Sequence, residues 1–484
     1  MVDLRRFFKP LNGALAVLLL AMTAPAWATI EAQFQQAMTA YHAGDYNQAF
    51  RLLQPLAQQG NAVSQYNLAL MYQKGQGVAQ DDKQAAVWYQ KAANQGDADA
   101  QFNLGVMYDR GQGVVQDDKQ AVAWYQKAAN QGDTRAQVNL GMMYENGRGV
   151  TQDYKQAMAW YQKAVNRGDV AAQVNLGKMY LNGQGVAQDY KQAMMWFQKP
   201  AKLGISQAQF NLGVMYQYGL GIPQNYKQAI MWYQKAANQG NAGAQNNLGN
   251  MYLNGQGVAQ NDKQAVAWYQ KAANQNHTEA QFNLGSMYAD GRGLAQDYKQ
   301  AAAWYLKAAN QEFAQAQVNL GMMHEDGIGV TQDDKQAAAW YQKAANQGNA
   351  EGQYSLGAMY YNGKGVAQDY KQAMAWYLKA ANQGLAQAQY DLGVMYQKGH
   401  GVAQNNKQAI TWFQKAAHQG FAMAQYNLGV LYRDGQGVAQ DYKQAVAWLK
   451  KAANQGYAMA QNNLGAMYAH GQGVAKSFQQ AAAW

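Results

Sequence analysis

Residues 100–132 read AQFNLGVMYDRGQGVVQDDKQAVAWYQKAANQG, and this stretch decides the fold of the chain. Leu104 and Tyr108 are four residues apart, so they share one face of a predicted helix that stops at Gly111. A second amphipathic helix is predicted to begin after Asp117, where the apolar residues again recur at helical spacing. The stretch therefore predicts two helices joined by a short loop.

The pattern recurs every 36 residues along most of the chain. From Asn61, which we number position 1, there are eleven full repeats at 61–456 and a partial twelfth at 457–484, and a degenerate capping helix pair precedes them at 29–60. The recurrence is visible in glycines spaced by 36 residues, at Gly60, Gly96, Gly132, Gly168, Gly204, Gly240, Gly348, Gly384, Gly420 and Gly456. Self-similarity at such a period is the signature of a repeat architecture.

Local signals predict where each helix starts and stops. A glycine at position 15, such as Gly111, predicts left-handed backbone at the end of the first helix, and a second glycine at position 17, such as Gly113, is followed by a predicted tight loop. Asp81 and Gln84 predict a capping box at the second helix, in which each side chain pairs with the other residue's backbone N–H. Where aspartate is absent, the expected caps are Asn225, Asn261, Asn405 and Ser477.

Two residues interrupt the repeated pattern. Glu312 occupies the position of a repeat-ending glycine, so we expect left-handed backbone there at some steric cost. Pro200 replaces an alanine in a second helix, and we expect it to remove one hydrogen bond and kink the last turn.

A single repeat cannot fold alone, because its few apolar side chains do not offset the entropy lost in ordering 36 residues. Stacked repeats share a continuous core instead. The prediction is an all-α solenoid of stacked helix pairs. Trp88, Trp124 and Tyr108 are its expected core residues, and Gly111 and Gly113 its structural turns.

The repeat resembles the Sel-one-like repeat (SLR) family of tetratricopeptide-type solenoids. The matching residues in one repeat are Ala100, Leu104, Gly105, Tyr108, Gly111, Gly113, Val114, Asp117, Trp124, Tyr125, Lys127, Ala128, Ala129 and Gly132. The resemblance implies a right-handed superhelix of antiparallel helix pairs whose first helices line the concave side. It also implies an adaptor that binds other proteins, since bacterial relatives are linked to envelope processes and host interaction.

The segment 1–28 is typical of a secretory signal peptide. Arg5 and Arg6 precede a short apolar run at 14–22, and an A-x-A motif ends at Ala28, after which we expect cleavage. The predicted mature protein is periplasmic or secreted and has no membrane span, because no other stretch is sufficiently apolar. The chain has 0 cysteines, so packing rather than disulfides must stabilise it.

The candidate partner-binding residues lie on the first helix, where position 6 is aromatic in seven repeats: Tyr66, Phe102, Phe210, Phe282, Tyr354, Tyr390 and Tyr426. These side chains either form an apolar inner groove for a helix or an extended peptide, or pack on the neighbouring repeat. Position 7 is asparagine in ten repeats, including Asn67, Asn103 and Asn139. Its amides either grip a peptide backbone or bond to an adjacent helix.

The net charge of +10 does not imply a nucleic-acid partner. Lys83 and its equivalents at position 23 form a basic stripe on the outer side, which is either simply solvated or recognises an acidic partner. The six histidines occupy unrelated positions and none has a partner at metal-ligand spacing, so we expect no metal, cofactor or catalytic residue.

The leading hypothesis is therefore a non-catalytic scaffold that binds proteins or peptide segments. Two alternatives stay open. A cysteine-rich branch of the family is associated with β-lactam binding and hydrolysis, although this chain lacks those cysteines. The aromatic rows and the asparagines are also compatible with binding a polysaccharide such as a cell-wall polymer.

Overall fold

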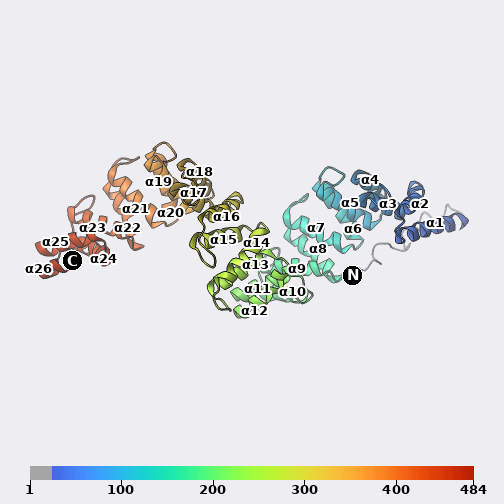
Figure 1. Ribbon diagram of the computed structural model, residues 1–484, viewed down its shortest axis with the longest axis horizontal. Coiled ribbons are helices and arrows are strands. Elements are labelled where there is room, and N and C mark those ends of the chain that lie inside the picture. Colours follow the sequence, from blue (N-terminus) through green and yellow to red (C-terminus); the bar gives the residue numbers. More distant parts are fainter. Residues whose placement is uncertain (1–23) are drawn as a thin grey trace. The chain divides into compact units, whose positions relative to one another are not determined.

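The computed structural model describes the backbone of residues 24–484 and the side chains from Thr29 onward. Nearly all of the predicted signal peptide lies outside the described residues, and the first described helix already includes Ala28. Within residues 24–484 the structure is entirely helical, with 26 helices and no strand (Figure 1). None of these helices is both long and apolar enough to cross a bilayer.

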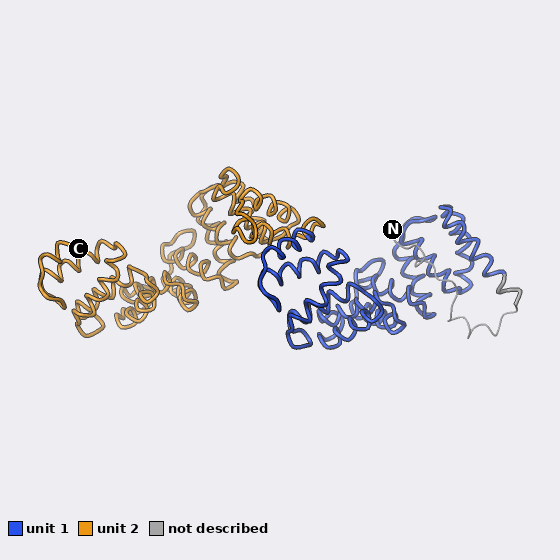
Figure 2. The backbone as a smooth tube through the Cα atoms, turned by 90° about the horizontal axis from the view of Figure 1, so that it is seen from below, with its two compact units in different colours: residues 1–236 blue, residues 237–484 orange. Residues whose placement is uncertain are grey.

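The described part of the chain divides into two units, residues 24–236 and 237–484 (Figure 2). Unit 1 contains α1 (Ala24–His42), α2 (Tyr46–Gln58), α3 (Ala62–Lys74), α4 (Asp82–Asn94), α5 (Ala98–Arg110), α6 (Asp118–Asn130), α7 (Thr134–Asn146), α8 (Tyr154–Asn166), α9 (Val170–Asn182), α10 (Tyr190–Lys202), α11 (Ser206–Tyr218) and most of α12 (Tyr226–Asn238).

Unit 2 contains α13 (Ala242–Asn254), α14 (Asp262–Asn274), α15 (Thr278–Asp290), α16 (Tyr298–Asn310), α17 (Ala314–Asp326), α18 (Asp334–Asn346), α19 (Ala350–Asn362), α20 (Tyr370–Asn382), α21 (Ala386–Lys398), α22 (Asn406–His418), α23 (Ala422–Asp434), α24 (Tyr442–Asn454), α25 (Ala458–His470) and α26 (Phe478–Ala483). In each unit a helix packs against the next one along the chain, so successive pairs stack. This arrangement confirms the predicted all-α solenoid.

The loop between the two helices of a repeat needs its glycines for two reasons. Gly111 has a φ angle of 67°, which confirms the predicted left-handed backbone, and Gly113 has a similar φ angle of 68°. A Cβ atom on Gly113 would also lie 2.1 Å from the carbonyl oxygen of Asp82, in the preceding repeat. Asn276 and Glu312, which replace the repeat-ending glycine, have φ angles of 65° and 63°. The expectation of left-handed backbone at Glu312 is thus confirmed.

The second helices are capped by the predicted residues but without a complete capping box. The Asp81 side chain accepts from the Gln84 N–H at 3.0 Å, and Asn225, Asn261, Asn405 and Ser477 accept in the same way. The reciprocal half of the box is wrong, because the Asp81 N–H donates to the Tyr72 carbonyl at 3.0 Å instead. The end of the first helix thus already provides the partner that Gln84 was expected to supply.

Pro200 leaves the length of its helix unchanged. Helix α10 extends through it to Lys202 and has 13 residues, as its neighbours do. The Ile205 N–H still donates to the Pro200 carbonyl at 3.0 Å, which matches the bond from Asp97 to Ala92 three repeats earlier. Because proline removes a donor but keeps its acceptor, the end of the helix closes as elsewhere.

The core of each full repeat is built around the residue at position 29, which is aromatic in ten of the eleven full repeats and is Leu449 in repeat 11. Tyr125 is fully buried beside Gly105 of the first helix, and a Cβ atom on Gly105 would lie 2.7 Å from the tyrosine ring. Trp88 and Trp124 are also buried, while Tyr108 is half-buried. A glycine at position 9 therefore sets how closely the two helices approach.

Buried glutamines link each repeat to the preceding one. Gln101, at position 5, donates to the Ala93 carbonyl of the preceding repeat at 3.0 Å. Gln131, at position 35, donates both to the Gln101 Oε1 atom at 2.8 Å and to the Gly96 carbonyl at 2.9 Å. Position 5 is glutamine in all twelve repeats, so the same amide connection recurs along both units.

Repeat 3 lacks part of this connection. Arg167 stands at position 35 in place of glutamine, and the buried Oε1 atom of Gln137 has no hydrogen-bond partner. A buried acceptor without a partner costs free energy.

We predict that Gln101→Leu lowers the free energy of unfolding by about 1–3 kcal/mol, because it removes two buried hydrogen bonds and leaves the Ala93 carbonyl with only the Gly96 N–H and the Gln131 amide with only the Gly96 carbonyl. Urea denaturation followed by circular dichroism measures the effect. Gln126→Leu is the matched control, since the Gln126 amide bonds only to the exposed Asn130. Equal losses in the two variants would contradict the structural role of Gln101.

We predict the opposite change for Arg167→Gln, which restores the missing donor to Gln137 and raises stability by about 1 kcal/mol. The same denaturation experiment measures it. Arg167→Ala removes the arginine without adding a donor, so it should not stabilise the protein. An equal gain from alanine would show that the arginine itself was unfavourable.

Candidate interaction surface

The first helices α3 to α25 present a surface of their own, formed mainly by repeat positions 3, 6, 7, 10, 13 and 14. We call it the first-helix face and describe it separately in each unit. It contains the residues that the sequence singled out for partner binding.

The aromatic residues at position 6 are half-buried and pack against position 29 of their own repeat. The ring centroids of Phe102 and Tyr125 are 6.0 Å apart, and those of Tyr354 and Tyr377 are 5.4 Å apart and stacked. Tyr66, Phe210, Phe282 and Tyr390 make the equivalent contact. Phe282, Tyr390 and Tyr426 also contact the next repeat. Much of each ring is therefore occupied by packing, and only an edge is left for a partner.

The asparagines at position 7 bond within the solenoid. Asn67 is buried and donates to the Val63 carbonyl at 2.8 Å. Asn103 is hydrogen-bonded to the hydroxyls of Tyr66 and Tyr89 in the preceding repeat, and Asn139 is hydrogen-bonded to that of Tyr125. The amides of Asn103 and Asn139 therefore bind tyrosine hydroxyls of the preceding repeat, whereas Asn67 bonds within its own helix.

The tyrosine hydroxyl at position 29 needs an acceptor on the first helix, and the sequence supplies one in two ways. In five repeats it donates to position 13, which is Gln73, Asp109, Glu145, Gln217 or Glu325. Where position 13 is Leu253 or Ala289, the hydroxyl donates to position 10 instead, at Asn250 and Ser286. Burial raises the pKa of these tyrosines well above its usual range, so they stay protonated donors.

The side chain at position 16 reaches back to positions 13 and 22 of the preceding repeat. Arg148 binds Asp109 at 2.6 Å and Asp118 at 2.5 Å. Lys364 lies 3.5 Å from Glu325, and the His400 ring stacks on Tyr370 while its Nδ1 atom is 2.9 Å from the Tyr361 hydroxyl. Leucines meet at the same place in repeats 4 and 5, where Leu181 and Leu220 share one cluster. Each contact between neighbouring repeats thus has its own chemistry.

Some side chains on the first-helix face are well exposed and differ between repeats. Met142 and Met322 at position 10 are 46% and 49% exposed, and Tyr218 at position 14 is 63% exposed. Position 10 also includes Lys178, Asn250 and Ser286, so its chemistry changes along the chain. These side chains, more than the predicted aromatics, are free to meet a partner.

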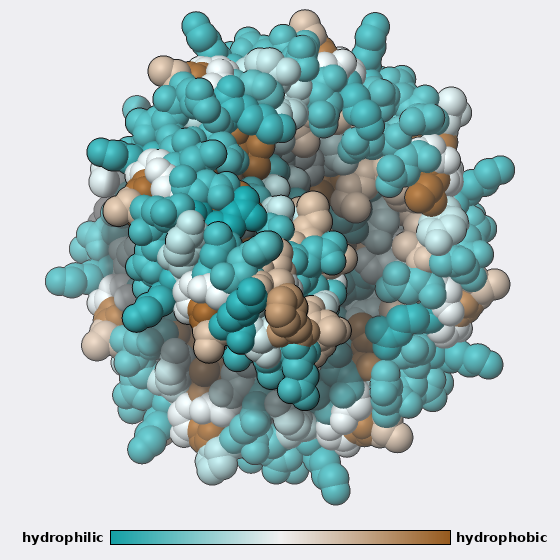
Figure 3. All heavy atoms as spheres, turned by 90° about the vertical axis from the view of Figure 1, so that its left-hand side faces the viewer, coloured by the Kyte–Doolittle hydropathy of each residue, from teal (hydrophilic) through white to brown (hydrophobic). Residues whose placement is uncertain are grey.

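The second helices present a basic surface. The lysines at position 23, such as Lys83, are exposed in all eleven full repeats. In ten repeats the lysine at position 31 lies over the tryptophan at position 28, as Lys163 does over Trp160 at 3.6 Å. Hydrophilic residues cover most of the face seen in Figure 3, and hydrophobic ones gather in small patches.

One carboxyl group departs from the repeated pattern. Asp391 occupies position 7, where ten repeats have asparagine, and burial raises its pKa to about 6 although the Tyr354 hydroxyl donates to it. No group of three or more His, Asp or Glu residues that could hold a metal ion is found from residue 29 onward.

Sequence reasoning missed the glutamines at positions 5 and 35 and the contact made by position 16. The signal for the glutamines was present, since a polar residue at the same place in all twelve repeats needs a structural reason. The signal for position 16 was the pairing of Asp109 with Arg148 and of Glu325 with Lys364, always 39 residues apart.

The model of one protein family, described as the Sel1 repeat, matches this chain in thirteen consecutive segments: 31–61, 62–97, 98–133, 134–169, 170–205, 206–241, 242–277, 278–313, 314–349, 350–385, 386–421, 422–457 and 458–484. The first of these segments includes most of the helix pair that the sequence marked as degenerate. No match is found among curated proteins.

Two solved structures are similar over much of the chain. A protective antigen of uropathogenic Escherichia coli that displays an SLR fold is 41% identical, with a TM-score of 0.68, over 82% of this chain and 85% of that one. A Sel1 repeat protein from Oxalobacter formigenes is 35% identical, with a TM-score of 0.49, over 65% of this chain and 94% of that one.

We predict that Asp391→Asn stabilises the protein at pH 8 by up to about 3 kcal/mol and at pH 4 by less than about 1 kcal/mol. Because the folded pKa of about 6 lies above the unfolded value of 3.8, the stability of the parent chain falls as the pH rises through this window. Thermal melting between pH 3.5 and 8 measures the difference. Asp290→Asn, at an exposed carboxyl, is the control, and a gain independent of pH would contradict the prediction.

Proposed function

Because this chain belongs to the Sel1 repeat family, we propose that it is a non-catalytic scaffold that binds a segment of a partner protein along its first-helix face. One observation carries the proposal. A framework that hardly changes between repeats presents exposed side chains that do change, including Met142, Tyr218 and Met322. Variable exposed side chains on a fixed framework are suited to recognising an extended partner.

The second-helix face is less suited to this role. Its lysines recur at the same positions in every full repeat, and most lysines at position 31 lie over a tryptophan. A uniform basic stripe keeps a protein soluble and offers little to distinguish one partner from another. The first-helix face is therefore the better candidate.

We further propose that the chain acts in the bacterial envelope or after secretion, because the sequence of residues 1–28 predicts a signal peptide. The alternatives of β-lactam binding and polysaccharide binding stay predictions. A chromogenic β-lactam and insoluble peptidoglycan are the probes that test them.

Crosslinking followed by a pull-down from envelope extracts tests the scaffold. We expect the full chain to capture a defined set of proteins, and Met142→Glu with Met322→Glu to lower their recovery at least tenfold, because new charges disrupt apolar contacts. Both methionines are exposed, so the fold should be unaffected.

The matched control is Val87→Glu with Met195→Glu, at second-helix residues that are 47% and 64% exposed. It should recover the same proteins as the parent chain. If both pairs of substitutions leave recovery unchanged, the first-helix face is not the binding surface.

A further inference from the structure

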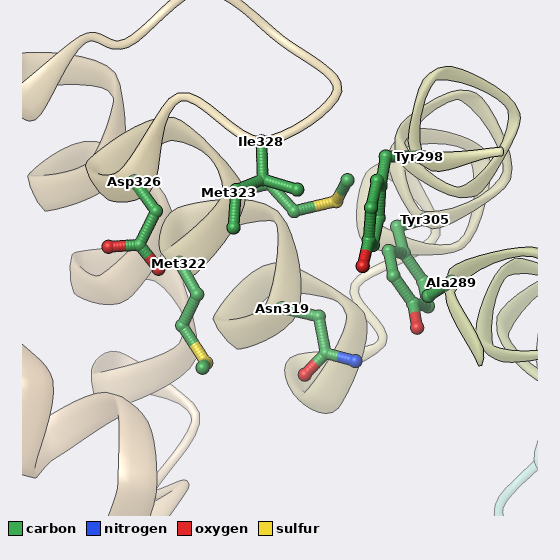
Figure 4. A pocket seen from close by; sticks show the side chains of 8 residues that line it. All are labelled: Ala289, Tyr298, Tyr305, Asn319, Met322, Met323, Asp326 and Ile328. Atoms are coloured by element: carbon green, nitrogen blue, oxygen red, sulfur yellow. The ribbon is translucent and has the colours of Figure 1, made fainter. Parts of the chain in front are cut away.

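A cavity opens on the first-helix face between repeats 7 and 8, within unit 2. It has a volume of about 230 Å³ and is lined by α15, α16, α17 and the loop after α17 (Figure 4). Its lining includes Ala289, Tyr298, Tyr305, Met322, Asp326 and Ile328. Three of these side chains, Tyr298, Met322 and Ile328, are more than 40% exposed, so apolar surface faces the opening.

The cavity exists because of one small residue. Ala289 occupies position 13, where the other full repeats have a larger side chain: Gln73, Asp109, Glu145, Leu181, Gln217, Leu253, Glu325, Tyr361, Gln397 and Arg433. In four other repeats that side chain meets position 16 of the next repeat, as Asp109 meets Arg148. Here the partner is Ile328, which cannot fill the space above an alanine.

The cavity is not a packing defect that leaves polar groups without partners. The Tyr305 hydroxyl donates to Ser286 at 3.1 Å and so does not depend on position 13. The walls are otherwise largely apolar. Figure 4 shows the Asp326 carboxylate beside Met322 on one side of the cavity and the rings of Tyr298 and Tyr305 on the other side. An apolar recess with one carboxylate at its edge is complementary to an apolar side chain next to a cation.

The charge of the surrounding face agrees with this chemistry. The five first helices α13 to α21 carry six carboxylates and a single lysine, Lys398: the carboxylates are Glu279, Asp290, Glu325, Asp326, Glu351 and Asp391. The second helices of the same repeats carry the lysines of positions 23 and 31 instead. Arg292 and Lys364 follow α15 and α19, and Lys364 pairs with Glu325, but the carboxylates still outnumber the cations. Although the chain as a whole has a net charge of +10, this part of its first-helix face is therefore acidic.

We propose that this cavity binds an aliphatic or aromatic side chain from a basic segment of a partner protein, and that a neighbouring lysine or arginine of that segment pairs with Asp326. The proposal rests on the scaffold function proposed above and names the chemistry of the partner. The apolar side chain provides the anchor, and the carboxylates of α15 and α17 select for positive charge.

Fluorescence anisotropy with labelled octapeptides tests the proposal directly. The probe is Gly-Ser-Lys-Phe-Arg-Lys-Ser-Gly, and the comparison peptides replace its phenylalanine by alanine or its three basic residues by glutamate. We expect saturable binding of the probe to the full chain, and at least tenfold weaker binding of each comparison peptide.

Ala289→Tyr fills the cavity and should weaken binding of the probe at least tenfold. Ala469→Tyr makes the same change at position 13 of repeat 12 and should not affect binding. Asp326→Lys, at an exposed residue, should weaken binding of the basic peptide and strengthen binding of the glutamate peptide. This exchange of charge preference tests the site even if Ala289→Tyr disturbs the fold.

Equal binding of the probe to the parent chain, Ala289→Tyr and Asp326→Lys overturns the proposal, as does the absence of binding at millimolar peptide. In that case the proposed scaffold function is still supported if the substitutions at Met142 and Met322 abolish partner capture. If that pair has no effect on capture, the scaffold function itself fails.

Discussion

In most repeats an aromatic side chain at position 29 fills the space that a glycine at position 9 leaves open in the first helix, and the rest of the repeat depends on this contact. Repeats 1 and 11 differ, with Ala69 at position 9 and Leu449 at position 29. Tyr125 lies against Gly105, where a Cβ atom would be only 2.7 Å from the ring. The ring crosses from one helix to the other, so its hydroxyl emerges next to the first-helix face. That hydroxyl needs a partner, and the partner is found at position 13 or 10 of the same repeat or at position 7 of the next.

This constraint explains why the residues predicted to bind a partner, at positions 6 and 7, mainly stabilise the fold instead. The asparagines at position 7 serve the buried hydroxyls, and the aromatic rings at position 6 cover the ring at position 29. Both therefore belong mainly to the framework. What remains for recognition is the set of exposed side chains that no neighbouring repeat requires, such as Met142, Met322 and Tyr218.

Most of the fold follows from the sequence because its signals are local and are repeated. Gly111 ends a helix and Asp81 starts one, wherever the repeat occurs. The site follows less well, because its determinants are contacts between repeats. The Asp81 N–H bonds to the Tyr72 carbonyl rather than to Gln84, and only the packed helix pair reveals that choice. From the sequence alone, Asn103 could equally be an exposed amide. Its hydrogen bond to Tyr66 of the preceding repeat becomes visible only when the two repeats are packed together.

Repetition within the chain also provides a comparison that needs no second protein. Equivalent positions of the eleven full repeats have similar surroundings. A repeat with a different residue at such a position therefore shows that the usual residue is not needed for packing there. Leu181 stands at position 13 where Phe197 has no hydroxyl to satisfy, so this change is explained within the repeat. Ala289 is different, because Tyr305 has a hydroxyl and turns to Ser286, which leaves the space at position 13 empty. The alanine at position 289 is compatible with the fold but is not required by it, and it lies on an acidic, exposed face. A function specific to this chain should therefore be sought at this position.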